Sequence, residues 1–171
     1  MLKTERLTIR RVRAEDWKAI QAIWADAANS EYAKFDKPNK LDDPSVCHRI
    51  AKWASFADSR EHIFFAVCFK DIVIGYVAFN KRDDGYEIGY CFHSDYHGKG
   101  YAKESISALF GVIKSGGKTR ITAGTALKNT PSVNLLTSLG FNRTYIEKVS
   151  FYKDSEGNDI VFDGGVFELI I

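Results

Sequence analysis

The sequence predicts an α/β (α+β) fold, in which one mixed, mostly antiparallel sheet of six to seven strands is flanked by about four helices. Segments that alternate apolar and polar residues, typical of strands, are interspersed with segments of helical apolar spacing. Three strand-like segments are joined only by tight turns, which favours an antiparallel meander. The 171 residues suffice for one core, and no linker or repeat divides them. We therefore expect a single domain over residues 1–171.

The N-terminal half supplies the first strand, two helices and the meander. Residues 7–13 alternate and predict a strand, and residues 14–28 have helical spacing. Asp43 and Pro44 predict the N-cap and first-turn proline of a second helix. The apolar faces of these helices should pack in the core and include Trp17, Trp24 and Trp53. The three strands of the meander follow at residues 62–69, 72–79 and 86–93.

The C-terminal half continues with two helices and three strands. A helix over residues 102–117 should end at its two glycines, Gly116 and Gly117. The strand at 118–127 is entered from that helix, so we expect it to run parallel to the strand before the helix. Thr130 and Pro131 should begin a short helix that stops at Gly140. The last two strands are expected at 141–153 and 159–171.

Charge and cysteine content narrow the class of protein. The chain has 24 Lys plus Arg against 22 Asp plus Glu, a net charge of +2, which gives no reason to propose nucleic acid or membrane as partner. Cys47, Cys68 and Cys91 are scattered and form no CxxC, so we expect reduced thiols and no metal site. The charged N-terminus and the lack of a long apolar run predict a cytoplasmic protein.

A glycine-bearing turn joins a strand to a helix within the stretch YEIGYCFHSDYHGKGYAKES, residues 86–105. A helix N-terminus presents unpaired backbone N–H groups, and glycines let a phosphate approach them closely. Lys99 adds positive charge at the rim. The alternative is that these glycines serve only as turn residues. The stretch matches neither a Walker loop nor the GxGxxG fingerprint of dinucleotide-binding folds.

The segment HGKGYA, residues 97–102, resembles the pyrophosphate loop of the GNAT N-acetyltransferases, written [Q/R]-x-x-G-x-[G/A]. His97 departs from that pattern, because Gln or Arg is usual at its position. Other segments resemble the RimJ/RimL-like branch, which includes ribosomal-protein N-terminal acetyltransferases. They are residues 4–10, 86–105, 129–141 and 159–171. The resemblance therefore extends over nearly the whole chain.

The resemblance implies acetyl-CoA as cosubstrate, bound where the strands at 86–93 and 118–127 diverge. It implies that the backbone amides of residues 98–103 bind the pyrophosphate. The implied cofactor-binding residues are Cys91, Phe92, His93, His97, Gly98, Lys99, Gly100, Tyr101, Ala102, Lys103, Asn129 and Asn134. No metal is implied.

Glu87 is the candidate base. It alternates with Tyr86 and Ile88 and so faces away from them, about 20 Å along the strand from His93. Acetylation of an amine requires a neutral nitrogen, hence a group that removes a proton. The resemblance implies that Glu87 does this, often through water. The alternatives are a solvated or ion-paired carboxylate at Glu87, and His93 as the base.

Ser132 is the candidate acid for the CoA thiolate. Many GNAT enzymes use a tyrosine on the last helix, but the register of LLTSLGF puts Leu136 there. RimL-like enzymes instead have a serine in NxxS, which matches Asn129 to Ser132. The alternative is that Ser132 only satisfies backbone amides in the first helical turn. Cys91 is expected to act as a small hydrophobic residue and not as a nucleophile.

The expected function is an acetyl-CoA-dependent N-acetyltransferase that works by direct attack in a ternary complex. The acceptor is expected to be a peptide or protein N-terminal α-amine, which loses its proton more easily than lysine does. The alternatives are a small-molecule amine acetyltransferase and a non-catalytic acyl-CoA-binding module. The loop at 29–43 is expected to flank the acceptor, and both monomer and homodimer remain open.

Overall fold

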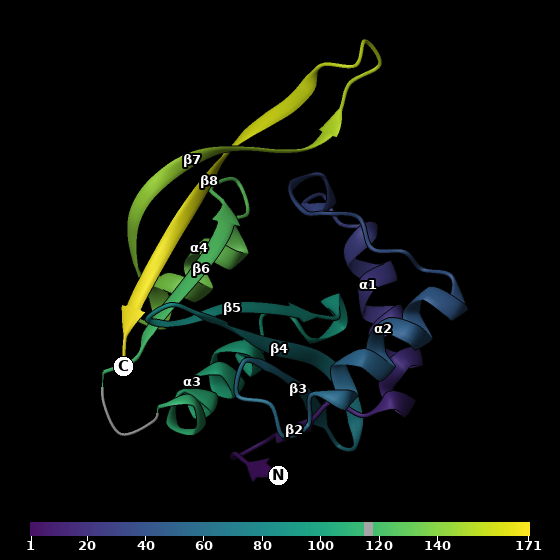
Figure 1. The fold of residues 1–171 in the computed structure, drawn as a ribbon, viewed down its shortest axis with the longest axis vertical. Helices are drawn as coiled ribbons and strands as arrows, with labels where there is room; N and C mark the ends of the chain where they lie inside the picture. The colour runs from purple at the N-terminus through teal and green to yellow at the C-terminus, as the bar shows by residue number, and fades with distance from the viewer. Residues whose placement is uncertain (115–117) are drawn as a thin grey trace.

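The computed structural model describes residues 1–114 and 118–171, whose eight strands form one sheet in the order β1-β2-β3-β4-β5-β6-β8-β7 (Figure 1). The strands are β1 (Leu2–Lys3), β2 (Thr8–Arg11), β3 (His62–Phe69), β4 (Ile72–Arg82), β5 (Gly85–Phe92), β6 (Arg120–Ala126), β7 (Asn142–Lys153) and β8 (Asp159–Ile170). The helices are α1 (Trp17–Ala28), α2 (Asp43–Ser55), α3 (Tyr101–Ile113) and α4 (Thr130–Ser138), with short 3-10 helices η1 (Ala14–Asp16), η2 (Ala33–Phe35) and η3 (Ser94–Tyr96).

The predicted fold class is confirmed, with one strand more than expected. β3, β4 and β5 form the antiparallel meander, and β6 pairs with β5 in parallel, as its entry from a helix predicted. The additional strand is β1, whose two residues pair with Ile9 and Thr8 of β2. Two residues are too few to show an alternating pattern, so β1 could not be predicted from the sequence.

Three helix boundaries differ from the predicted ones. Residues 14–16 form η1, so α1 begins only at Trp17. The N-cap of α2 is Asp42 and not Asp43, because the Asp42 carboxylate accepts a hydrogen bond from the amide of Ser45 at 3.0 Å. Helix α3 ends at Ile113, and the stop predicted at residues 116–117 lies outside the described residues.

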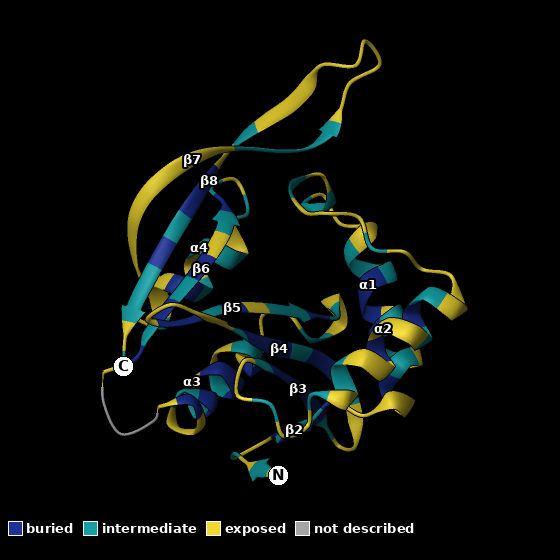
Figure 2. Ribbon diagram, viewed as in Figure 1, coloured by how far each residue is buried: buried dark blue, intermediate teal, exposed yellow. Residues whose placement is uncertain are grey.

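The helices cover both faces of the sheet, and a buried apolar cluster lies between the sheet and the helices on each face (Figure 2). Helices α1 and α2 pack on one face, where Trp24 is buried and Trp17 and Trp53 pack beside it, as expected for core tryptophans. Helices α3 and α4 pack on the other face around Leu109 and Leu136. Odd-numbered and even-numbered residues of β5 therefore face different layers.

β7 and β8 form a long hairpin that extends past the rest of the sheet (Figure 1). We call this hairpin the arm. It contacts η2, which lies in the loop between α1 and α2. The rings of Phe35 and Phe162 are 5.2 Å apart, and the Tyr152 hydroxyl donates to the Ala33 carbonyl at 3.4 Å. The arm thus contacts the loop between α1 and α2, which is far from it in the sequence.

Candidate active site

β5 and β6 diverge after three paired residues. Their parallel pairing ends at Glu87 and Thr122, although β5 continues to Phe92 alongside β4. Figure 1 shows β6 turning away from β5. Within the described part of the chain, no strand pairs with the far edge of β5 beyond Glu87, so its backbone N–H and C=O groups remain able to bind an extended chain of amides.

The loop after β5 presents unpaired backbone amides at the N-terminus of α3. Gly98 and Gly100 have φ angles of +70° and +80°, a conformation that glycine adopts without steric cost. The first helical hydrogen bond of α3 runs from the Glu104 amide to the Gly100 carbonyl at 3.0 Å. Among the described residues, the amides of 98–103 donate to no protein acceptor. Six free donors at a helix N-terminus fit a pyrophosphate.

His97 fixes this loop to the end of β5. Its Nε2 lies 2.8 Å from the carbonyl oxygen of Phe92, within hydrogen-bond distance. The unusual residue at the first position of the loop motif thus has a structural use. Lys99 is turned back, since its Nζ donates to the Asp95 carbonyl at 2.7 Å. The loop therefore presents its amides, more than its side chains, to a ligand.

His93 has structural partners that make it a poor candidate base. Its amide donates to the Ile74 carbonyl at 2.9 Å, and its Nδ1 accepts from the amide of Asp95 at 3.3 Å as the N-cap of η3. Of the remaining predicted cofactor residues, Phe92 and Tyr101 have buried side chains, whereas Lys103 and Asn134 are exposed.

Arg6 and Glu104 brace the loop from outside, a contact that sequence reasoning missed. Arg6 Nη1 donates to the Lys99 carbonyl at 2.9 Å, and its guanidinium pairs with the Glu104 carboxylate at 2.7 Å. Partial burial alone would raise the pKa of Glu104, but hydrogen bonds from Thr4 and Arg6 lower it. The residues are 98 positions apart. The resemblance of residues 4–10 to the family does not specify which side chain contacts the loop.

Glu87 lies at the point where β5 and β6 separate. Its neighbours across the sheet are Asn80 on β4 and Thr122 on β6. Arg82 donates to its Oε2 in an ion pair, and both side chains are about half exposed, at 55% and 46%. Glu87 is therefore an ion-paired carboxylate at its Oε2 atom, as one of the predicted alternatives states. Oε1 has no protein partner within the described residues and is able to bind water.

Ser132 contacts a hydroxyl on β5 that the sequence analysis did not single out. Its Oγ lies 2.9 Å from the Tyr90 hydroxyl, and burial raises the pKa of Tyr90. The Asn129 side chain accepts from the Ser132 amide at 3.3 Å as the N-cap of α4. Asn129 thus has a capping role, while the Ser132 hydroxyl is directed at β5. Leu136 is buried in the core.

The base and acid candidates lie on opposite sides of the divergence. Glu87 faces the α1 and α2 layer, whereas Tyr90 and Ser132 lie in the α3 and α4 layer. Gly89 and Gly124 are exposed beside the opening, and a Cβ at either would meet no atom within 4 Å. The opening is therefore not blocked by side chains at these two positions.

Cys91 is unsuited to nucleophilic attack. Burial, followed by the charges of Asp36 and Asp26, raises the pKa of its thiol to about 12. The thiolate is therefore almost absent at neutral pH. Cys91 remains adjacent to the free edge of β5 and contributes backbone groups there.

An open β5 edge followed by an anion site at a helix N-terminus is the arrangement of an acyl-CoA-binding acetyltransferase, and the family comparison agrees. Residues 6–142 match the model of the acetyltransferase (GNAT) domain, so the chain belongs to the GNAT acetyltransferase family. It is an acyltransferase, an N-acetyltransferase with acetyl-CoA as cosubstrate.

Two curated relatives are similar over most of the chain. The uncharacterized N-acetyltransferase p20 of Bacillus licheniformis is 30% identical over 146 residues, covering 83% of this chain and 82% of that protein. The uncharacterized N-acetyltransferase YnaD of Bacillus subtilis (strain 168) is 27% identical, covering 91% and 90%. Among solved structures, a GNAT-family acetyltransferase of Bacillus anthracis has a TM-score of 0.75 and 25% identity, covering 99% and 97%.

The described residues contain neither a membrane-spanning helix nor a cluster of metal ligands. No helix there is long and apolar enough to cross a membrane. No group of three or more His, Cys, Asp or Glu side chains in that part of the chain is placed to hold a metal ion.

Proposed function

We propose that the acceptor is the N-terminal α-amine of a peptide or protein, as in the RimJ/RimL-like branch. The observation that carries this is the surface between η2 and the arm, where two adjoining pockets of about 380 and 340 Å³ share Lys34 and Ile160. Each is as large as a small-molecule site, so together they hold several residues of a polypeptide.

Structural neighbours support this acceptor class through their fold. One is the ribosomal L7/L12 α-N-protein acetyltransferase RimL in complex with CoA, with a TM-score of 0.79 and 14% identity over 98% of this chain. Another is the ribosomal-protein-S5-alanine acetyltransferase of Vibrio fischeri, with a TM-score of 0.76 and 18% identity over 99%. A small-molecule amine is the second candidate, because the self-immunity acetyltransferase MccE, solved with acetyl-CoA and AMP, has a TM-score of 0.80 at 16% identity.

The proposed chemistry uses one group on each side of the divergence. Glu87 Oε1, through a water molecule, takes a proton from the acceptor ammonium, so that the neutral nitrogen attacks the thioester carbonyl carbon. A C–N bond forms and the C–S bond breaks. Ser132 donates a proton to the departing thiolate and regains one from the attacking nitrogen, which loses its second proton as the amide forms, while Tyr90 holds the Ser132 hydroxyl by a hydrogen bond. The free amides of residues 98–103 and the β5 edge orient the cosubstrate.

The test uses pairs of peptides that differ only in a free or a formyl-blocked N-terminus, with acetyl-CoA and detection of released CoA. We expect turnover only with free N-termini, and mass spectrometry should place the acetyl group on the α-amine. Glu87→Gln should lower kcat/KM about 100-fold or more, because general-base catalysis contributes on that order. Glu61→Gln, an exposed carboxylate outside the site, is the matched control and should leave turnover unchanged.

Two results would contradict this proposal. Turnover of small primary amines with none of the peptides would assign the enzyme to small molecules. Equal turnover of the formyl-blocked peptides that contain lysine would move the acceptor from the α-amine to a side chain.

A further inference from the structure

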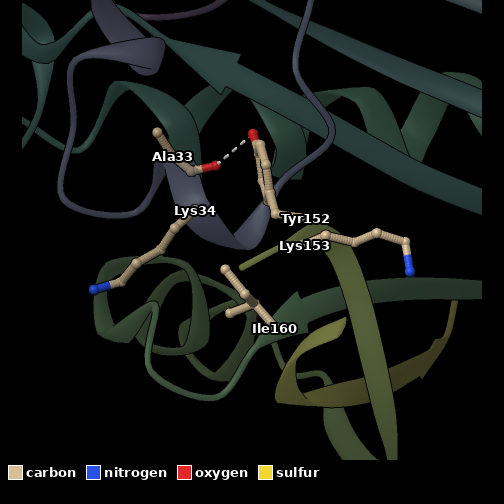
Figure 3. A pocket seen from close by; sticks show the side chains of 5 residues that line it. All are labelled: Ala33, Lys34, Tyr152, Lys153 and Ile160. Carbon is tan, nitrogen blue, oxygen red and sulfur yellow. Dashed lines mark hydrogen bonds between the residues drawn. The ribbon is translucent and has the colours of Figure 1, made fainter. Parts of the chain in front are cut away.

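Two adjoining cavities of the described residues lie between η2 and the arm. The first is lined by Ala33, Lys34, Tyr152, Lys153 and Ile160 (Figure 3). The second is lined by Lys34, Phe35, Lys128, Lys148, Ile160, Val161, Phe162 and Asp163. Lys34 and Ile160 line both, so the two cavities adjoin. We call this pair of cavities the arm groove.

The arm groove combines apolar surface with an excess of lysine. Ile160 and Val161 are adjacent and exposed at 47% and 54%, so they give the groove contiguous apolar surface that a partner could cover. Figure 3 shows Lys34 and Lys153 extending to opposite sides of the first cavity. Apolar contacts with flanking positive charge suit a segment that carries both apolar and acidic side chains.

Two of the four lysines are neutralised and two are not. Lys148 pairs with Asp163 at 2.6 Å, and Lys153 pairs with Asp159 at 3.1 Å. Within residues 1–114 and 118–171, neither Lys34 nor Lys128 has a carboxylate within 4.0 Å. Their charges are therefore available to a ligand.

Two residues that line the arm groove are sequence neighbours of residues at or near the candidate site. Lys128 directly precedes Asn129, the N-cap of the helix whose first turn holds Ser132. Asp36 directly follows Phe35, and its charge, with that of Asp26, acts on Cys91 at the free edge of β5. Carboxylates thus lie near β5 and unpaired lysines lie farther out.

The change from negative charge near β5 to positive charge in the arm groove fits one kind of acceptor. An ammonium group at the active site would be attracted towards Glu87, and carboxylates a few residues away along the acceptor would be attracted towards Lys34 and Lys128. On the basis of the proposed function, we infer that the enzyme prefers polypeptide acceptors whose residues directly after the N-terminus are acidic and apolar, and that these residues bind in the arm groove.

The experiment compares three hexapeptides with the same two N-terminal residues. Their last four residues alternate leucine with glutamate, with serine or with lysine. We expect kcat/KM to be about tenfold higher for the glutamate peptide than for the serine peptide, the effect of two surface ion pairs, and lowest for the lysine peptide. The preference should reside in KM and shrink as ionic strength rises, because exposed charges are screened by salt.

Variants test whether the arm groove is responsible. The double variant Lys34→Glu and Lys128→Glu should reverse the order of the glutamate and lysine peptides while acetyl-CoA affinity stays the same. Lys52→Glu, an exposed residue at the end of α2, is the matched control and should keep the wild-type order.

The outcomes separate this inference from the function on which it rests. Equal acetylation of all three peptides would overturn the acidic preference and leave the α-amine proposal standing. Acetylation of phosphate-bearing small amines in place of every peptide, lost in the double variant, would overturn both and assign the lysines to a phosphate.

Discussion

At Gly100 the backbone takes the left-handed conformation directly before the first turn of α3. A Cβ there would come within 3.3 Å of Arg6 Nη2, and any side chain would be strained at φ +80°. Gly100→Glu also places a negative charge among the free amides. We expect calorimetry to detect no acetyl-CoA binding by this variant, whereas the parent binds in the micromolar range.

Gly157→Glu is the matched control for this prediction. It makes the same substitution at another positive φ, +87°, in the turn of the arm, where a Cβ meets no atom within 4 Å. It should bind acetyl-CoA normally. Normal binding by Gly100→Glu would mean that the cosubstrate phosphates lie elsewhere.

The hydroxyl pair formed by Ser132 and Tyr90 carries a second prediction. Burial raises the pKa of Tyr90, so its phenol stays protonated at neutral pH and remains able to donate. Ser132→Ala should lower kcat about 10- to 100-fold with little change in acetyl-CoA affinity. Tyr90→Phe should lower it less, since the Ser132 hydroxyl remains. Presteady-state and steady-state rates of CoA release measure both effects.

Ser138→Ala separates this role from a structural one, because Ser138 also lies in α4 and its hydroxyl bonds only to the Leu135 carbonyl. Its kcat should match the parent. A Ser132→Ala enzyme with unchanged kcat would return Ser132 to the role of a first-turn helix residue.

At the scale of elements, β2 and the start of α1 are joined by an ion pair between Arg10 and Asp16. Both Asp16 oxygens accept from Arg10 at 2.7 Å, one also accepts from the Arg13 amide at 2.8 Å, and Asp16 is only 6% exposed. Burial alone would raise the pKa of Asp16, but these hydrogen bonds lower it below its usual value.

Asp16→Asn should therefore lower the free energy of unfolding by about 2 to 4 kcal/mol at pH 7, because it leaves Arg10 without its charge partner. Since the folded pKa is depressed, the contribution of Asp16 is fully present above the unfolded pKa of about 3.9 and is lost as pH falls through the folded pKa. Urea denaturation of the parent and the variant should thus converge below about pH 4.

Asp83→Asn is the control, because Asp83 is exposed in the turn between β4 and β5. Its free energy of unfolding should match that of the parent at every pH. A difference between Asp16→Asn and the parent that stays constant from pH 7 to pH 3 would argue against the ion pair as its source.

Periodicity and turn residues predicted most elements, because their causes are local. The alternation of β5, the glycines after it and the helical spacing of α3 all lie within about thirty neighbouring residues. The contacts that complete the site are not local. Tyr90 and Ser132 are 42 residues apart, and Arg6 and Glu104 are 98 apart. No pattern in the sequence specifies which distant hydroxyl or carboxylate a side chain contacts. These two pairs could therefore be identified only from the folded structure.

At the scale of the whole molecule, the contact between η2 and the arm joins the loop between α1 and α2 to the C-terminal hairpin. Phe162→Ala removes the ring that packs on Phe35 at 5.2 Å, a pair worth about 0.5 to 1.5 kcal/mol. We expect KM for peptide acceptors to rise about 2- to 10-fold and the acetyl-CoA dissociation constant to stay unchanged. Initial-rate kinetics with each substrate varied in turn measure both.

Tyr145→Ala, on the same arm but 55% exposed, is the control and should leave both constants as they are. A Phe162→Ala enzyme with weakened acetyl-CoA binding and normal peptide KM would place the arm on the cosubstrate side.

The short parallel ladder between β5 and β6 has a consequence for how the molecule is stabilised. Only three residue pairs join the two halves of the sheet, so the amides along the free edge of β5 should exchange with solvent faster than those paired with β4. A cosubstrate bound along that edge would act as a missing strand and slow their exchange. By mass action it would also add about 2.7 kcal/mol of stability at a hundredfold excess over its dissociation constant. The enzyme should thus be most resistant to unfolding when acetyl-CoA is bound.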